Sequence, residues 1–143
     1  MPEHYEFPSP RYRDRADAGR ALAERLAQYA DDKPVLLAIP NGGVPVAAII
    51  AEALQVKLRL MIARKLQIPG NPEAGFGAVT PDGNMILNYP LIMHLGLREP
   101  HIQRQREKAL AEAAAKREAF GQWAETPPLA GRMVVLVDDG LAS

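Results

Sequence analysis

The sequence predicts an α/β protein in which helices flank a parallel β-sheet. Residues 35–39 and 133–137 are two apolar runs, rich in β-branched residues, with no polar break. Runs of this kind are typical of strands that are buried on both faces, as in a parallel sheet. A glycine turn follows the first run and leads into residues 46–54, which are apolar nearly all round and so predict a helix buried against that sheet.

Composition narrows the class of protein. The chain has 143 residues, with 17 lysines and arginines balanced by 17 aspartates and glutamates. We expect one domain with its own core, and neither nucleic acid nor an anionic membrane as the main partner. The absence of cysteine excludes disulfides and thiol chemistry. Because no stretch reads as a leader peptide or a membrane span, we expect a cytoplasmic protein with no membrane partner.

The first predicted helix covers the sheet. Asp14 is placed to cap it, Asp17 is placed to complete a capping box, and the helix runs to about Ala30. Its arginines are interleaved with acidic residues, which indicates a solvated face. Its predicted apolar face consists of Ala18, Leu22, Leu26 and Tyr29.

The loop after the first strand is a candidate anion site. Asn41, Gly42 and Gly43 lie between the strand and a helix whose first turn contains Pro45. Unpaired N–H groups and the positive end of the helix dipole would point at this loop. The alternative is a tight turn that needs glycine only for its dihedral angles.

Two cations follow the next predicted strand, residues 57–63. Arg64 and Lys65 would stand at its far end. They are either solvated charges that protect a sheet edge or groups that hold a polyphosphate.

The middle of the chain predicts a β-hairpin and a long helix. We expect residues 67–77 to form a loop, because they hold two prolines and three glycines. Residues 78–88 predict a hairpin around a Pro-Asp-Gly turn, forming a lid or a sheet edge, and we expect residues 89–100 to be irregular. Residues 101–122 predict a helix with a Glu112–Lys116 pair. Its thin apolar face consists of Ile102, Ala109, Ala113 and Phe120.

The acidic pair after the last strand is the strongest functional signal. Asp138 and Asp139 follow an apolar strand directly, and in open α/β sheets ligands bind beyond the carboxyl ends of the strands. With Gly140 and the small residues up to Ser143, they could begin a phosphate cradle. The pattern also describes magnesium sites, phosphate acceptors and ordinary capping turns. The three histidines lack metal-ligand spacing, and we expect no metal site made by the protein alone.

Together these segments resemble the type I phosphoribosyltransferase family, and especially its stand-alone bacterial and archaeal members of undefined substrate. The resemblance covers nearly the whole chain, and its most specific part is the strand that ends in the acidic pair. The matching segments are Phe7 with residues 13–19, residues 38–46, Arg64 and Lys65, residues 77–79, Asp82 and Gly83, and residues 134–143.

The resemblance implies a Rossmann-like parallel sheet flanked by helices, with a small hood that contains the inserted hairpin. It implies transfer of the phosphoribosyl group of phosphoribosyl pyrophosphate to a nitrogenous acceptor, with Mg²⁺ bound mainly through the substrate. The acceptor is open and could be a nucleobase, and a homodimer is also left open. No residue is marked as the general base, although Asp139 is a candidate.

The resemblance also implies roles for individual residues. Asp138 and Asp139 would be the catalytic carboxylates that engage the 2′- and 3′-hydroxyls of the ribose. The residues implied to bind the 5′-phosphate are Gly140, Leu141, Ala142 and Ser143. Those implied to bind pyrophosphate are Asn41, Gly42 and Gly43, supported by Arg64 and Lys65, although many relatives carry a basic residue at the position of Asn41.

The sequence departs from the family at its end. In the family the loop continues past the position of Ser143 into a glycine, further hydroxyl residues, a helix and at least one more strand. We therefore expect residues 1–143 to form a single phosphoribosyltransferase-like domain that is incomplete at the C-terminus. Two alternatives follow: a non-catalytic module that binds a phosphosugar or nucleotide, or an inactive truncated fragment.

Overall fold

The structure is a computed structural model that describes residues 12–140, and its contacts divide into two compact units. Among the described residues, the first unit contains residues 12–58 and 127–140, and the second contains Arg59–Thr126. The expectation of one domain stays a prediction.

The predicted parallel sheet lies mostly in the first unit, and its outer strand, Leu58–Leu60, crosses into the second unit. β1 (Val35–Ala38) lies between β2 (Leu58–Leu60) and β6 (Val134–Val137) in the strand order β2-β1-β6. β1 and β6 are parallel, with Val35 opposite Val134 and Ala38 opposite Val137. The α/β class and the parallel pairing of the two apolar strands are thus confirmed, and all four residues of β1 are buried.

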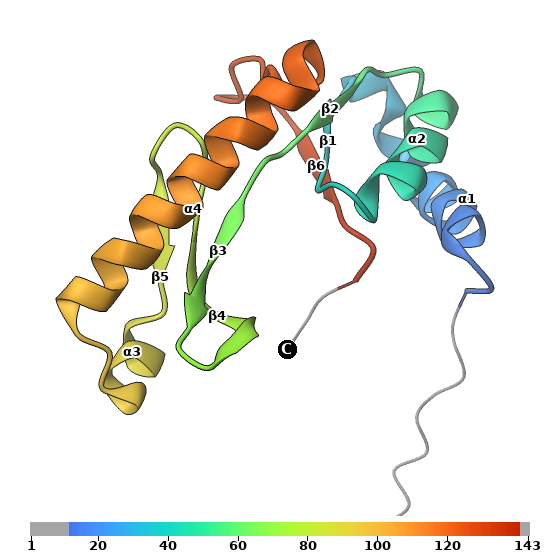
Figure 1. The fold of residues 1–143 in the computed structure, drawn as a ribbon. Helices are drawn as coiled ribbons and strands as arrows, with labels where there is room; N and C mark the ends of the chain where they lie inside the picture. Colours follow the sequence, from blue (N-terminus) through green and yellow to red (C-terminus); the bar gives the residue numbers. More distant parts are fainter. Residues whose placement is uncertain (1–11, 141–143) are drawn as a thin grey trace, which may run out of the picture. The chain divides into compact units, whose positions relative to one another are not determined.

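Helix α2 (Gly43–Leu54) is covered on two sides, which explains why it is apolar nearly all round. It contacts β1 and β6, and α1 (Arg15–Leu26) packs along it (Figure 1). The two helices approach closely because Gly19 of α1 has no side chain: a Cβ atom there would lie 3.0 Å from the Ile49 Cβ atom. The predicted helix is therefore confirmed, although it begins at Gly43.

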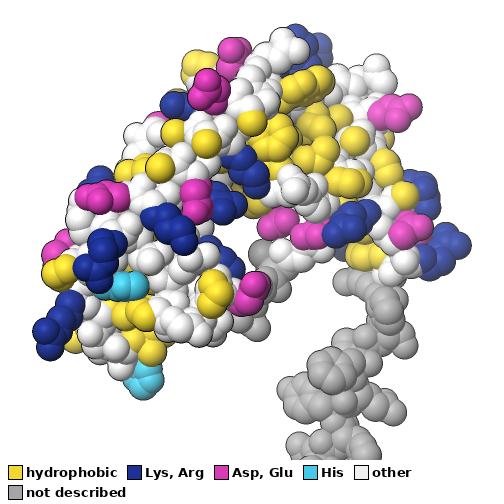
Figure 2. Space-filling model, viewed as in Figure 1, with side chains coloured by type: hydrophobic (Ala, Val, Ile, Leu, Met, Phe, Trp, Pro, Cys, Tyr) yellow, Lys and Arg dark blue, Asp and Glu magenta, His cyan; other side chains and the backbone are white. Residues whose placement is uncertain are grey.

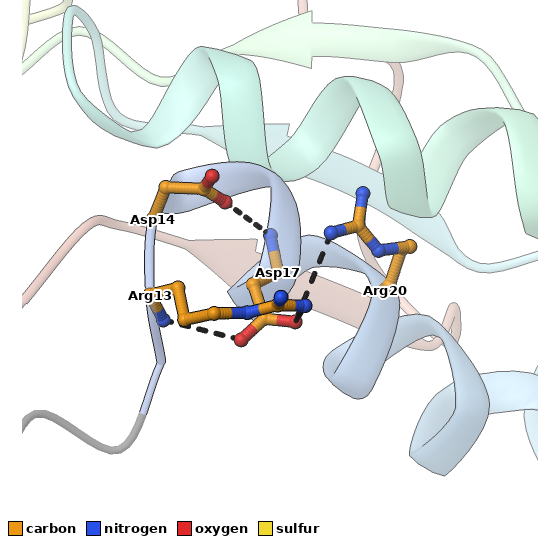
Figure 3. Close-up of polar contacts among 4 residues, drawn as sticks. All are labelled: Arg13, Asp14, Asp17 and Arg20. Carbon is orange, nitrogen blue, oxygen red and sulfur yellow. Dashed lines mark hydrogen bonds and ion pairs between the residues drawn. The ribbon is translucent and has the colours of Figure 1, made fainter.

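Helix α1 differs in detail from the prediction. Its buried positions are Gly19 and Ala23, whereas Tyr29 is exposed in a 3-10 turn, η1 (Ala27–Asp32), that follows the helix. Asp14 caps the helix by accepting a hydrogen bond from the Asp17 N–H group at 2.7 Å. In a capping box the Asp17 side chain would accept from the Asp14 N–H group. It accepts instead from the N–H group of the preceding residue, Arg13, at 3.1 Å (Figure 3).

Strand β6 is not buried on both faces as predicted. Val134 and Leu136 are 39% and 57% exposed, and only Val137 is buried. The physical reason is its position at the edge of the described sheet, where β1 is its one neighbour.

The second unit is an antiparallel sheet covered by helices (Figure 1). Its strands are β3 (Arg64–Ile68), β4 (Asn71–Val79) and β5 (Met85–Leu87), and its helices are α3 (Tyr89–Leu95), α4 (Glu99–Phe120) and the 3-10 turn η2 (Gly121–Ala124). Its core cluster is Leu66, Phe76, Val79, Ile92, Ile102 and Ala109. The predicted hairpin is confirmed in β4 and β5, with Val79 opposite Met85.

Three sequence expectations for residues 64–100 are wrong. Residues 67–77 are not a loop, because β3 and β4 pair across them and turn at Gly70, which has a φ of +73°. Residues 89–100 are not irregular, because they contain α3 and the start of α4. Asn88 caps α3 by accepting from the Leu91 N–H group at 3.1 Å. Arg64 and Lys65 begin β3 and do not end the preceding strand.

Helix α4 confirms the predicted long helix. Ile102, Ala109 and Ala113 are buried, and charged side chains of both signs lie along its exposed surface (Figure 2). Glu112 pairs with Arg64 of β3 and not with Lys116, so the predicted helical pair is wrong. Among residues 12–140, no helix is both long and apolar enough to span a membrane.

Candidate functional site

The end of β6 lies directly against the start of α2 within the first unit. A Cβ atom on Gly43 would be only 2.6 Å from the Val137 carbonyl oxygen, so glycine is required for this approach. The Ile39 N–H group also donates to the Val137 carbonyl at 2.9 Å. The acidic pair and the glycine turn, which are almost one hundred positions apart in sequence, therefore meet at one end of the sheet.

The Asp139 carboxylate occupies the space above Gly42. The nearest atoms to a Cβ atom placed on Gly42 would be the carboxylate atoms of Asp139, which would overlap it. On another side, an Arg15 Nη2 atom donates to Asp139 Oδ2 at 2.7 Å. Asp139 is thus held between the first residue of α1 and the turn that begins α2.

The charge of Asp139 is favoured by these contacts. The hydrogen bond and the positive charge of Arg15 hold the pKa of Asp139 below its ordinary value of 3.8. A carboxylate with a lowered pKa is a weaker base, because it holds a proton less tightly. The geometry therefore favours Asp139 as a fixed, negatively charged acceptor of hydrogen bonds. It favours this role over the general base that the sequence left open for Asp139.

Asp138 is exposed, and its side chain turns back on the chain. Its Oδ1 atom accepts from the Asp139 N–H group at 2.8 Å. Gly140 follows with open space around it, since a Cβ atom there would meet nothing within 4 Å. Leu141, Ala142 and Ser143 lie outside the described residues.

The glycine turn has some N–H groups engaged and others without a backbone partner. The Gly43 N–H group donates to the Ile39 backbone carbonyl at 3.0 Å, and the Val44 N–H group donates to the Asn41 backbone carbonyl at 3.2 Å. The N–H groups of Asn41 and Gly42 have no backbone acceptor within residues 12–140. The peptide bond between Pro40 and Asn41 in this turn is cis. The Asn41 and Gly42 amides are therefore the donors of this turn that a bound anion could satisfy.

The two predicted cations belong to the second unit and are bonded inside it. Arg64 donates to Glu112 Oε2 from Nε and Nη2, at 3.1 and 2.8 Å. Lys65 donates to the Glu73 carbonyl. Each cation therefore has an acceptor within its own unit.

The described residues offer two carboxylates at this site and no larger ligand group. Among residues 12–140, no cluster of three or more histidine, cysteine, aspartate or glutamate side chains could hold a metal ion. Mg²⁺ usually keeps several waters and binds through one or two carboxylates plus substrate phosphates. The exposed pair fits a Mg²⁺ ion that arrives on a phosphorylated ligand.

Arg15 is the site residue that sequence reasoning missed. The interleaved charges of its segment predict a solvated helix face, and 57% of its side chain is indeed exposed. Its contact with Asp139 joins positions 124 residues apart. No local pattern signals such a contact.

The fold and this site together define a Rossmann-like α/β protein with an acidic pair and a glycine turn at one end of its parallel sheet. Residues 12–143 match the family model of the phosphoribosyl transferase domain, and the chain belongs to this family. The described residues of both units, 12–140, lie within the matched stretch.

Individual proteins agree with this assignment. The chain is 42% identical over 130 residues to a protein named "Putative phosphoribosyl transferase" in two strains of Mycobacterium tuberculosis, CDC 1551 and H37Rv. The match covers 91% of this chain and 29% of the relatives' length. The crystal structure of TT1426 from Thermus thermophilus is 34% identical with a TM-score of 0.73, and the match covers 90% of this chain and 61% of that one.

Proposed function

We propose that the chain carries the sugar-binding half of a phosphoribosyltransferase site, which transfers the phosphoribosyl group of phosphoribosyl pyrophosphate to a nitrogenous acceptor. The observation that carries this proposal is the contact between the acidic pair and the glycine turn. Family membership supports the reaction class. The acceptor class follows from the chemistry of the family, with a nucleobase as one candidate.

The acidic pair suits the sugar. Asp138 and Asp139 are exposed carboxylates at the end of a strand, and carboxylates accept hydrogen bonds from hydroxyl groups. In the proposed site they accept from the 2′- and 3′-hydroxyls of the ribose. Their negative charge also stabilises the positive character that develops on the sugar as its bond to pyrophosphate breaks.

The glycine turn suits the leaving group. In the proposal, pyrophosphate binds to the Asn41 and Gly42 amides and the positive end of α2, which is supported by the lack of a backbone acceptor for these amides within residues 12–140. During transfer the bond from C1′ to the pyrophosphate oxygen breaks and its electron pair leaves with pyrophosphate. The acceptor nitrogen forms a bond to C1′ and gives its proton to the surroundings.

The remaining residues take supporting roles. In the proposal Gly140, Leu141, Ala142 and Ser143 bind the 5′-phosphate, and Arg64 and Lys65 add positive charge for pyrophosphate. Mg²⁺ bound through the substrate would neutralise the diphosphate and help it to leave.

The first test is a thermal melt with and without magnesium and phosphoribosyl pyrophosphate. A ligand that binds the folded state alone stabilises it by about 2.7 kcal/mol at a hundredfold excess over its dissociation constant. We expect the midpoint to rise for the wild type. We expect no rise for the Asp138→Asn, Asp139→Asn double variant, which keeps the side-chain shapes and removes the charges.

The outcomes separate the alternatives. A shift that the double variant loses, together with pyrophosphate release when acceptor bases are added, supports the transferase. The same shift without release for any acceptor supports a binding module that does not turn over. No shift for the wild type contradicts a working sugar site in this chain.

A further inference from the structure

Arg15 is set apart from the other arginines at the start of α1 by its partner. Arg13, just before the helix, and Arg20, on the helix, both pair with Asp17, at 3.3 and 3.7 Å (Figure 3). Arg15 pairs with Asp139, beyond the end of β6, at 2.7 Å. Its guanidinium is thus directed away from its own helix and onto the proposed sugar-binding carboxylate.

The Asp139 side chain is confined on two sides. Gly42 leaves the space that the carboxylate fills, and Arg15 bonds Oδ2. The other charged group beside it is Asp138, whose Oδ1 atom accepts a hydrogen bond from the Asp139 backbone N–H group. The start of α2 adds no charged side chain. Arg15 is therefore the one positive side chain that bonds Asp139 in the described structure.

We infer that Arg15 is a positioning residue for sugar recognition, which holds the Asp139 carboxylate above Gly42 with Oδ1 free for a ribose hydroxyl. This inference rests on the proposed function and names a residue that the function did not include. Arg15 acts through Asp139 and is not itself expected to contact pyrophosphate.

The simpler explanation of the Arg15–Asp139 contact is an ion pair that stabilises the fold. The small stabilisation expected from such a pair argues against this as its main role. Both side chains are more than one third exposed. Exposed ion pairs contribute little to stability, because water screens the charges and both side chains lose conformational freedom. Such a pair adds little to the fold, but it can decide where a carboxylate points, because a guanidinium presents its donors in a fixed planar fork.

The test compares two ligands that probe different parts of the site. Ribose 5-phosphate requires the acidic pair, whereas inorganic pyrophosphate requires the glycine turn. For Arg15→Gln we expect ribose 5-phosphate binding to weaken about fivefold, the upper range for an exposed pair. We expect pyrophosphate binding to change less than twofold, as measured by isothermal titration calorimetry.

Arg20→Gln is the matched control. Arg20 lies on the same helix, its side chain is also 57% exposed, and its substitution changes the net charge equally. We expect it to leave both affinities unchanged. Arg15→Lys keeps the charge without the fork, and we expect it to recover part of the loss.

A double-mutant cycle tests the route through Asp139. In an Asp139→Asn background, Arg15→Gln should cause no further loss of ribose 5-phosphate affinity. Equal losses for both ligands, or a loss that adds to that of Asp139→Asn, would overturn the positioning role. Wild-type binding of phosphoribosyl pyrophosphate with no effect of Arg15→Gln would overturn this inference alone. No wild-type binding would overturn the proposed function as well.

Discussion

Gly43 shows how one residue brings the two halves of the site together. A methyl group at this position would meet the backbone carbonyl of Val137 at 2.6 Å, and a backbone atom cannot move aside as a side-chain end can. We predict that Gly43→Ala destabilises the chain by about 1–3 kcal/mol, as overpacking typically does. Alanine favours a helix over glycine by up to about 1 kcal/mol, which does not offset the clash.

Urea unfolding followed by circular dichroism measures this change. Gly140→Ala is the control, since its added methyl group meets nothing within 4 Å. We expect that control to stay within about 0.5 kcal/mol of the wild type. A Gly43→Ala variant as stable as this control would show that β6 and α2 do not meet as described.

The same residue scale shows what sequence could and could not supply. Asp138, Asp139 and the glycine turn could be found because each follows an apolar strand directly. Their mutual contact could be expected from the rule that ligands bind beyond the carboxyl ends of strands. Arg15 lies within residues 13–19, one of the segments of the family resemblance, but its contact with Asp139 across 124 positions has no local signal.

At the scale of elements, the start of α1 should respond to acid. The Arg13 N–H group and then the Arg13 side chain hold the pKa of Asp17 below its ordinary value of 3.8. A lowered pKa means that the charged form stabilises the folded state. That stabilisation is complete above the ordinary value and is lost as the pH falls through the folded-state pKa.

We therefore predict that the melting midpoint of the wild type falls as the pH is lowered below about 4. Asp17→Asn should start from a lower midpoint at pH 7 and fall less steeply. A slope will remain, because the pKa values of Asp82 and Asp139 are also lowered. Melts of both proteins from pH 7 to pH 3 measure the difference, and parallel curves would contradict the Asp17 contribution.

The elements that sequence reasoning missed share a physical cause. Pro72, Gly75 and Gly77 indicated a loop, yet they lie in β4. Gly77 is needed there because a Cβ atom would collide with the Ile86 carbonyl of β5, and glycine in a strand marks such an approach. Helix α3 carries only short local signals, a cap at Asn88 and a left-handed Gly96, and it is anchored by Ile92 in the core cluster. Packing within the unit therefore contributes to both elements.

At the scale of the whole molecule, the expectation of one domain can be tested against the two compact units. One family model matches both units, and β2 spans the boundary between them at Leu58 and Arg59. A domain of this size usually unfolds in a single cooperative transition. We predict that damage to the core of either unit destabilises both.

The chain offers a matched pair of substitutions and a reporter for this prediction. Leu36 of the first unit and Leu66 of the second are both 0% exposed, and truncating a buried leucine to alanine costs about 2–5 kcal/mol. Trp123, the one tryptophan, lies in the second unit, so its fluorescence reports that unit. Leu66→Ala lowers the unfolding midpoint reported by Trp123 whether the chain has one domain or two. In a single cooperative domain Leu36→Ala lowers it as well, because the loss in one unit is shared by the whole transition. A Trp123 midpoint that Leu36→Ala leaves unchanged would show that the units unfold independently and that the chain has two domains.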